Sequence, residues 1–186
     1  RVVTNGMSQH SRNERNANSG LVVALDAADL APFERFPGDP LAGIALQREL
    51  EERAFRLGGH SYAAPAQRLE DFLAARPSTR LGAIAASYQP GVHPADLAEL
   101  LPTPITAALR EALPAFARKL KGYDHPDAVL TGVETRTSSP VRVPRDEALE
   151  SLNVQGLVPA GEGAGYAGGI LSAGIDGIRA AEAVAR

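Results

Sequence analysis

The feature that most constrains this chain is a glycine-rich segment between a short apolar run and a helical pattern near the C-terminus. Five glycines fall within residues 161–169, and Gly163, Gly165 and Gly168 give the spacing G-x-G-x-x-G. Glycine lets a backbone come within hydrogen-bond reach of a ligand, and the free N–H groups of a helix start favour an electron-rich group. The segment therefore predicts a strand, a ligand-facing loop and a helix in succession.

The spacing alone does not define a complete dinucleotide site. Such a site also needs a second parallel strand that ends in Asp or Glu about 20 residues further on. Counted from Gly168, that position falls beyond Arg186, so we expect the main pyrophosphate loop to lie elsewhere. The structural alternative is a tight strand-to-helix turn. Gly174 and Gly177 lie inside the helical pattern and cost up to about 1 kcal/mol each relative to Ala, which favours close packing on a sheet or a planar cofactor.

A second candidate segment runs from Gly132 to Arg142, in which Arg136 and Arg142 flank three hydroxyl side chains and a fourth, that of Thr135, precedes Arg136. The planar guanidinium groups of Arg136 and Arg142 suit a carboxylate or a phosphate. The alternative is a solvated hairpin or crossover with ordinary surface arginines. Arg145 is taken as an example of such a surface arginine, with which Arg136 can be compared. The amide-rich residues 5–19 form a third segment, which either binds a ligand through side-chain amides or consists of capped turns.

Apolar periodicity predicts mixed helices and strands in three regions. Leu46, Leu50, Ala54 and Leu57 define one helical face, with Glu49, Glu51, Glu52 and Arg53 on the other side and Gly58-Gly59 as the stop. A second helical face runs from Ile105 to Leu120, and Pro114 predicts a kink or a break there. Shorter helices are expected around 66–74 and 94–101, and a small-residue helix from Ile170 to Arg186. Strands are expected at 21–25, 129–133, 140–143 and 156–160.

Composition excludes several classes of function. The net charge is −3, aromatic residues make up 5% and tryptophan is absent, so nucleic-acid binding is not expected. There is no cysteine, the four histidines lack metal-ligand spacing, and no G-x-S-x-G is present, so we expect no metal site and no hydrolase nucleophile. No apolar run is long enough to span a bilayer. The acidic residues show no paired arrangement, and the pattern assigns no catalytic acid or base. The chain begins Arg1-Val2-Val3, which we interpret as an excised portion of a longer protein.

Several of these stretches together resemble one bacterial family, the poorly characterised FAD-dependent dehydrogenases, which are two-domain NAD(P)/FAD-dependent oxidoreductases. The resemblance extends in order over essentially the whole chain. It is carried by residues 5–8, 16–19, 64–68 and 101–102, by the segment from Gly132 to Arg142, and by residues 156–157, 161–170 and 176–178. Gln9-His10-Ser11 departs from the family pattern, in which an aromatic or small residue is expected.

The resemblance implies an α/β (α+β) fold, the C-terminal part of a Rossmann-like flavoprotein with an inserted, largely helical second domain. Residues 1–30 and 128–186 would belong to the FAD-binding domain, and 31–127 to the inserted substrate or cap domain. Gly161 and Glu162 would lie near the ribityl and pyrophosphate groups of FAD. The other implied cofactor contacts come from the glycine segment and the arginine segment: Gly163, Gly165, Gly168, Gly169, Ile170, Arg136 and Ser138.

We therefore expect a cytoplasmic FAD-dependent oxidoreductase fragment, with NAD(P)H as an electron donor and an unknown small-molecule substrate. The fragment alone would be inactive, because its partner is the missing N-terminal half of the same protein. The flavin would carry the hydride chemistry while the protein supplies orientation and charge. The alternative is a non-enzymatic helical interaction or structural domain whose glycine loop serves only close packing.

Overall fold

The computed structural model describes residues 1–4 and 9–185, which combine helices with a small sheet in an α+β arrangement. The described chain divides into two compact units. Unit 1 comprises residues 1–26 and 48–135, and unit 2 comprises residues 27–47 and 136–186. The predicted division into an FAD-binding domain and an inserted domain concerns a larger protein and stays a prediction.

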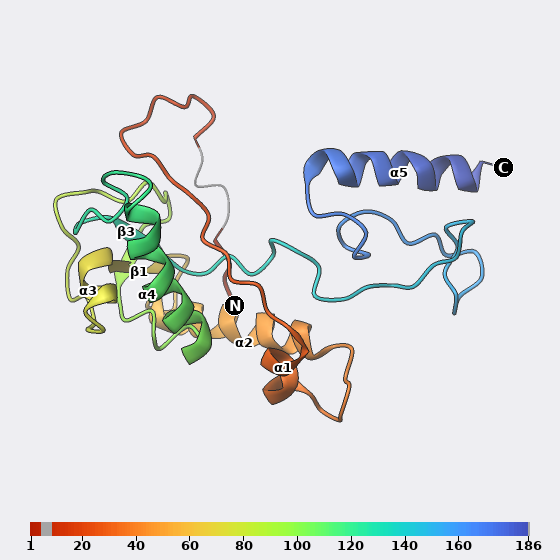
Figure 1. Cartoon of the computed structure of the whole chain (residues 1–186), viewed down its shortest axis with the longest axis horizontal. Coiled ribbons are helices and arrows are strands. Elements are labelled where there is room, and N and C mark those ends of the chain that lie inside the picture. The colour runs from red at the N-terminus through yellow and green to blue at the C-terminus, as the bar shows by residue number, and fades with distance from the viewer. Residues whose placement is uncertain (5–8, 186) are drawn as a thin grey trace. The chain divides into compact units, whose positions relative to one another are not determined.

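Unit 1 is built around a three-stranded sheet in the order β2-β1-β3. Strands β1 and β3 are labelled in Figure 1. The central strand β1 (Ala64–Arg68) pairs in parallel with β2 (Val92–Pro94) and antiparallel with β3 (Val129–Thr131). Ala64, Ala66 and Gln67 in β1 are at most 1% exposed, so the central strand is buried on both faces. The predicted strand at 129–133 is confirmed in its first part. Strands β1 and β2 were not predicted, and the helix predicted around 66–74 forms only over Leu69–Leu73, since residues 66–68 belong to β1.

Helix α2 (Ala42–Leu57) confirms the predicted helix and its stop signal. Leu46, Leu50 and Ala54 are buried, and the Gly58 N–H donates to the Ala54 carbonyl at the helix end. One prediction about its polar face is wrong. Glu51 is only 4% exposed, and its carboxylate accepts the Thr135 hydroxyl at 2.8 Å, so this side chain is held inside unit 1.

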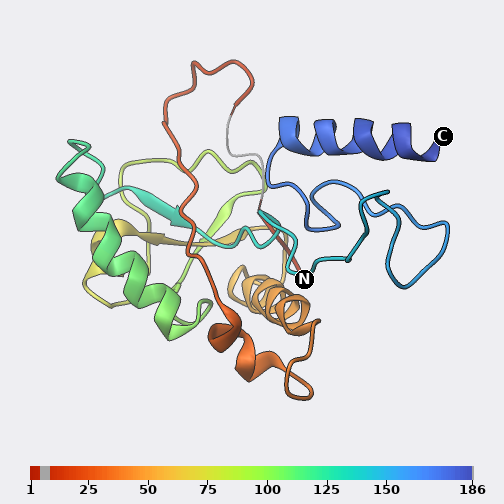
Figure 2. The same cartoon turned by 45° about the vertical axis from the view of Figure 1, so that its right-hand side comes forward.

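Two further helices complete the core of unit 1 (Figure 2). Helix α3 (Leu69–Leu73) buries Phe72 completely, and α4 (Thr103–Ala117) buries Leu113. Of the kink or break predicted at Pro114, the break is wrong, since α4 continues through this residue. Pro114 lies in the last turn, where the loss of one backbone hydrogen bond disrupts little of the helix. The predicted helix at 94–101 is also wrong: β2 ends at Pro94 and turns follow.

Three predicted strands are not formed. Residues 21–25 have no regular structure and Val22 is 73% exposed. Residues 140–143 and 156–160 likewise lack a ladder of strand hydrogen bonds. Apolar sequence favours a strand only when a neighbouring strand can pair with it, and the described chain offers these segments no such neighbour.

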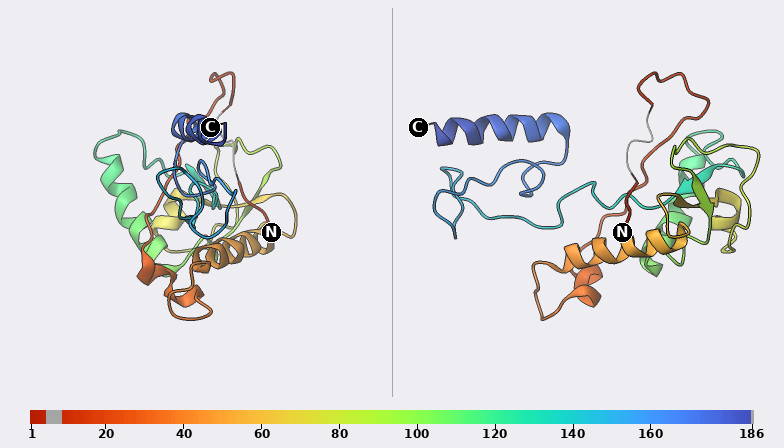
Figure 3. Two further views of the ribbon diagram at one scale, coloured as in Figure 1. Left: turned by 90° about the vertical axis from the view of Figure 1, so that its right-hand side faces the viewer. Right: turned by 180° about the vertical axis from the view of Figure 1, so that it is seen from behind.

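Unit 2 contains two short helical turns, α1 (Ala27–Leu30) and η1 (Ala31–Phe33), the start of α2, and the C-terminal helix α5 (Ile170–Val184). Between residues 136 and 169 the chain consists of turns and irregular segments. Figure 3 shows α5 as one uninterrupted helix after the glycine-rich loop. The helix predicted from Ile170 is thus confirmed.

Candidate functional site

The glycine-rich segment forms a tight loop, residues 161–169, rather than a strand-to-helix turn. Gly161 and Gly165 have positive φ values of 70° and 82°, a region that L side chains rarely adopt. A Cβ on Gly165 would lie 2.7 Å from the Val141 carbonyl oxygen and 3.0 Å from the Arg142 Cα. The absence of a side chain at Gly165 therefore serves close packing within the chain.

Gly163 and Gly168, the first and last glycines of the G-x-G-x-x-G spacing, have open space where a side chain would lie, unlike Gly165 in the middle. A Cβ on Gly163 or Gly168 would meet no heavy atom of the described chain within 4 Å. Gly169 is the N-cap of α5, has extended backbone at φ −164°, and has no side-chain hydrogen bond capping the helix. Backbone at these positions can thus be approached from outside the loop.

The residues that follow Arg136 and Ser138 in the chain are hydrogen-bonded to the loop. The Ser139 hydroxyl donates to the Gly163 carbonyl at 3.1 Å, and the Val143 N–H donates to the Ala164 carbonyl at 3.1 Å. The structure therefore brings the two segments that the sequence singled out into direct contact.

An aromatic ring fixes the far end of the loop. The Tyr166 hydroxyl accepts the Arg145 backbone N–H and donates to the Val143 carbonyl, both at 3.1 Å. The Arg145 guanidinium lies 3.7 Å from the Tyr166 ring centroid, and that of Arg142 lies 4.4 Å from it. Arg142 thus stacks on the loop.

A buried ion pair links the loop to α5. Arg145 and Asp176 form a two-pronged contact, with Nη2–Oδ1 at 2.6 Å and Nη1–Oδ2 at 3.0 Å. The same guanidinium donates to the Pro159 carbonyl at 2.6 Å, and the Gly161 N–H donates to Asp176 Oδ2 at 2.7 Å. The Arg145 hydrogen bond, followed by that from the Gly161 N–H, lowers the pKa of Asp176 to about 2.

This pair corrects the expectation that Arg145 is an ordinary surface arginine. The side chains of Arg145 and Asp176 are only 9% and 11% exposed. The sequence shows no paired acidic arrangement, and its motifs did not single out Asp176 as a partner. The signal that could have found it was a lone acid among Gly, Ala and Ile in a helical pattern, since a charge in apolar surroundings needs a partner. Its partner, 31 residues away, could not be read from the sequence.

The other predicted site residues are distributed around the loop. Gly163, Gly168, Arg136, Ser138 and Ile170 are exposed, whereas Gly161, Glu162, Gly165 and Gly169 are partly buried. A Cβ added to either of the interior helix glycines, Gly174 and Gly177, would meet no heavy atom of the described chain within 4 Å. The sequence predicts that Gly174 and Gly177 pack closely against a neighbouring element, but none of the described residues packs against them.

The amide-rich segment gives a different outcome. Residues 5–8 lie outside the described part of the chain. Asn16 donates its side-chain amide to the Ala85 carbonyl at 2.6 Å and to Ser87 Oγ at 3.0 Å, and Ser19 Oγ lies 2.9 Å from the Tyr123 hydroxyl. These contacts favour the structural alternative for Asn16 and Ser19.

Metal ligation and membrane insertion find no support in the described residues. Within residues 1–4 and 9–185, no group of three or more His, Asp or Glu side chains could hold a metal ion. None of the helices in this described part is both long and apolar enough to cross a membrane.

Comparison with known proteins identifies a relative over most of the chain. An uncharacterized protein of Clostridium beijerinckii (strain ATCC 51743 / NCIMB 8052) is 51% identical over 183 residues, which is 98% of this chain and 33% of that protein. The chain therefore spans about a third of the length of this relative. The family described as "FAD-dependent protein, C-terminal domain-like" matches residues 1–137, so its match includes the described core of unit 1 and ends before the glycine-rich loop. On this match, the chain belongs to the FAD-dependent protein C-terminal domain-like family.

Proposed function

We propose that this chain is the C-terminal portion of an FAD-dependent oxidoreductase and that its glycine-rich loop contributes to the flavin site. Membership of the FAD-dependent family carries the proposal, because it links the chain to this cofactor independently of the loop. The intact protein, meaning a polypeptide of about the relative's length, would supply the main pyrophosphate loop and the rest of a Rossmann-like domain. The middle region, 31–127, would then be the inserted domain.

The residues of the loop fit a flavin in part. Gly163 and Gly168 are exposed, with no heavy atom of the described chain within 4 Å of where a Cβ would lie, and the uncapped start of α5 at Gly169 offers N–H groups to an electron-rich group. Glu162 can accept hydrogen bonds from hydroxyl groups of the ribityl chain. Arg136, Ser138 and Ile170 are exposed, so a ligand can reach them. Gly161 and Gly165 support the site indirectly by shaping the loop.

FAD, when bound, supplies hydride transfer. The residues of this chain would orient the flavin and stabilise negative charge on it through the helix start. The substrate is a small molecule, and NAD(P)H as electron donor rests on the resemblance alone. The absence of cysteine supports a reducing compartment, which we take to be the cytoplasm.

The test is the flavin content of the intact protein. We expect the purified protein to show the visible absorption bands of oxidised flavin, and anaerobic addition of NADH or NADPH to bleach them. The 186-residue chain should bind FAD at least about a hundredfold more weakly than the intact apoprotein, a loss of roughly 2.7 kcal/mol or more. Equal affinity would make the loop at 161–169 the primary cofactor site and contradict the division between the two parts.

The alternative is a non-enzymatic interaction or structural domain. Gly165 favours it, because its missing side chain is explained entirely by packing against Val141 and Arg142. An intact protein that remains colourless after incubation with FAD and forms a stoichiometric complex with another macromolecule would support this alternative.

A further inference from the structure

We propose that Asp176 and Arg145 are positioning residues that hold the glycine-rich loop in the conformation that receives the cofactor. This inference rests on the proposed function and deepens it, since it assigns a role at the flavin site to two side chains outside the predicted site residues. Neither side chain is required to touch the flavin.

Asp176 connects the loop entrance to the helix that follows the loop. It lies six residues after the start of α5, about 9 Å along the helix axis. From there its Oδ2 accepts the N–H of Gly161, the first residue of the loop, at 2.7 Å. One carboxylate thus fixes the distance between the loop entrance and the helix start, the two parts proposed to contact the flavin.

Arg145 holds the other parts of the same loop. Its guanidinium donates to the carbonyl of Pro159, two residues before the loop, at 2.6 Å, and its backbone N–H donates to the Tyr166 hydroxyl in the second half of the loop at 3.1 Å. The loop is therefore attached at both ends, while Gly163 and Gly168 stay uncovered. This arrangement leaves the approachable glycines rigidly placed, as a preorganised binding site requires.

Ordinary packing cannot replace the pair. Gly161 and Gly165 have positive φ and provide no side chain to pack, and the buried apolar residues within the described residues 136–185 are Pro159, Ala164 and Ala180. Loss of either partner would leave the other buried charge unpaired, which is costly. The pair is therefore the charged contact that joins the loop entrance to α5, and it acts together with the hydrogen bonds that Ser139, Val143 and Tyr166 make with the loop.

The experiment measures FAD affinity and the state of bound FAD in the intact protein. Three variants test the pair. Asp176→Asn keeps an acceptor for the Gly161 N–H but loses the negative charge, and Asp176→Ala loses both. Arg145→Lys keeps the positive charge but loses the two-pronged guanidinium contact. Asp71→Asn is the matched control, because the Asp71 side chain in unit 1 is 9% exposed, close to the 11% of Asp176, and likewise lies 2.6 Å from an arginine nitrogen. Thermal unfolding identifies variants that are unfolded at the temperature of the titration.

We expect Asp176→Ala to weaken FAD binding at least about tenfold, Asp176→Asn and Arg145→Lys to weaken it less, and Asp71→Asn to leave it unchanged even where it lowers the melting temperature. At saturating FAD, the Asp176 variants should also shift the visible circular dichroism and the reduction potential of the flavin, which a loss of stability alone would not change. If Asp176→Ala does not fold, the graded effects of Asp176→Asn and Arg145→Lys carry the test.

Two results would overturn the inference, and they are distinguishable. If the wild-type protein binds FAD and the folded Asp176 and Arg145 variants match it in affinity, circular dichroism and potential, the positioning role is wrong and the proposed function stands. If the wild-type protein binds no FAD, both the proposed function and the positioning role at a flavin site are overturned.

Discussion

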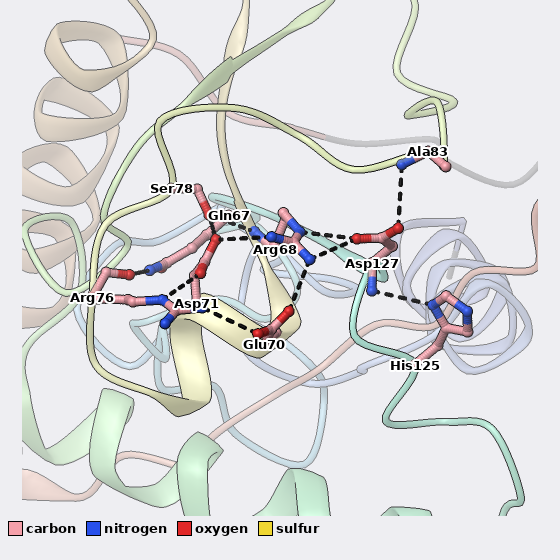
Figure 4. A network of polar contacts seen from close by, with 9 residues as sticks. All are labelled: Gln67, Arg68, Glu70, Asp71, Arg76, Ser78, Ala83, His125 and Asp127. Atoms are coloured by element: carbon pink, nitrogen blue, oxygen red, sulfur yellow. Dashed lines mark hydrogen bonds and ion pairs between the residues drawn. The ribbon is translucent and has the colours of Figure 1, made fainter.

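Asp71 in unit 1 and Asp176 in unit 2 are both about nine-tenths buried, and each accepts hydrogen bonds from an arginine at 2.6 Å. Around Asp71 the arginine contact is one of many (Figure 4). Asp71 also accepts the Ser78 hydroxyl at 2.7 Å, and the neighbouring Gln67 amide bridges the Arg76 carbonyl and the Leu97 N–H, both at 2.8 Å. The network therefore connects β1, through Gln67, to the segments that contain Arg76 and Leu97.

The two surroundings differ in how much apolar surface supports the polar contacts. The network of unit 1 lies beside a packed core in which Phe72 and Leu100 are 0% exposed. In unit 2, by contrast, the large side chains of α5 are exposed, with Ile170 at 93% and Leu171 at 83%. Burial of apolar surface is the main stabilising contribution in folding. The comparison indicates that unit 1 is stabilised by its apolar core, whereas the loop of unit 2 is held mainly by polar contacts, among them the Arg145–Asp176 ion pair and the hydrogen bonds of Ser139 and Tyr166.

The largest expected effect is the loss of a core side chain in unit 1. Replacing Phe72 by Ala removes a fully buried ring and should lower the free energy of unfolding by about 3–5 kcal/mol. Urea unfolding followed by circular dichroism measures this. Tyr62→Ala is the control, because Tyr62 is 80% exposed and its removal should change stability by less than about 0.5 kcal/mol. Similar losses for both variants would contradict the picture of a packed core in unit 1.

The next largest effect distinguishes a glycine that packs inside unit 2, Gly165, from a glycine proposed to approach the cofactor, Gly169. Gly165→Ala places a Cβ at positive φ and 2.7 Å from a carbonyl oxygen, and should destabilise the loop by about 1–3 kcal/mol. Gly169→Val is compatible with the extended backbone at φ −164°, so the fold should persist while the FAD content of the intact protein falls sharply. Thermal unfolding and flavin absorbance distinguish the two outcomes. Normal flavin content in Gly169→Val would refute close approach of the ring to the helix start.

Acid should weaken both carboxylate networks. Hydrogen bonds from Arg145 and Gly161 lower the pKa of Asp176 to about 2, and those from Ser78 and Arg76 lower the pKa of Asp71. A lowered pKa stabilises the folded state above the unfolded value of about 3.9, and this contribution disappears as the pH falls through the folded pKa. Unfolding measured between pH 5 and about pH 2 should therefore show falling stability. Asp176→Asn should be less stable than wild type at pH 5 and lose less stability on acidification.

The smallest effect concerns the exposed arginine of the second candidate segment. Since Arg145 is buried, the suitable control for Arg136 is Arg80, which is exposed in unit 1. If Arg136 contacts the flavin or the substrate, Arg136→Lys should weaken FAD binding or turnover a few-fold because the planar fork is lost, and Arg80→Lys should not. Equal, negligible effects in isothermal titration would favour an ordinary surface role for Arg136.

Local patterns predicted α2 and α5 well because their signals act within a few residues. The spacing of Leu46, Leu50 and Ala54 requires a helical face, and glycines at 58–59 end it. The same reasoning failed for residues 21–25 and 156–160, since a strand needs a partner that lies far away in sequence or outside this chain. It also missed β1, whose Ala, Pro and Gln residues are poor strand formers held in place by neighbours on both sides.

The sequence by itself determined the glycine-rich loop and the helix that follows it, because these follow from residue types at fixed spacing, whereas the link to FAD-dependent proteins came from resemblance to a family rather than from spacing. Only the tertiary structure decided which glycines pack inside the chain and which remain open, since that depends on Val141 and Arg142 lying against Gly165. It likewise decided that Arg145 is buried with Asp176. An ion pair forms through space, between groups that the folded backbone brings within about 4 Å, and no local pattern encodes that distance.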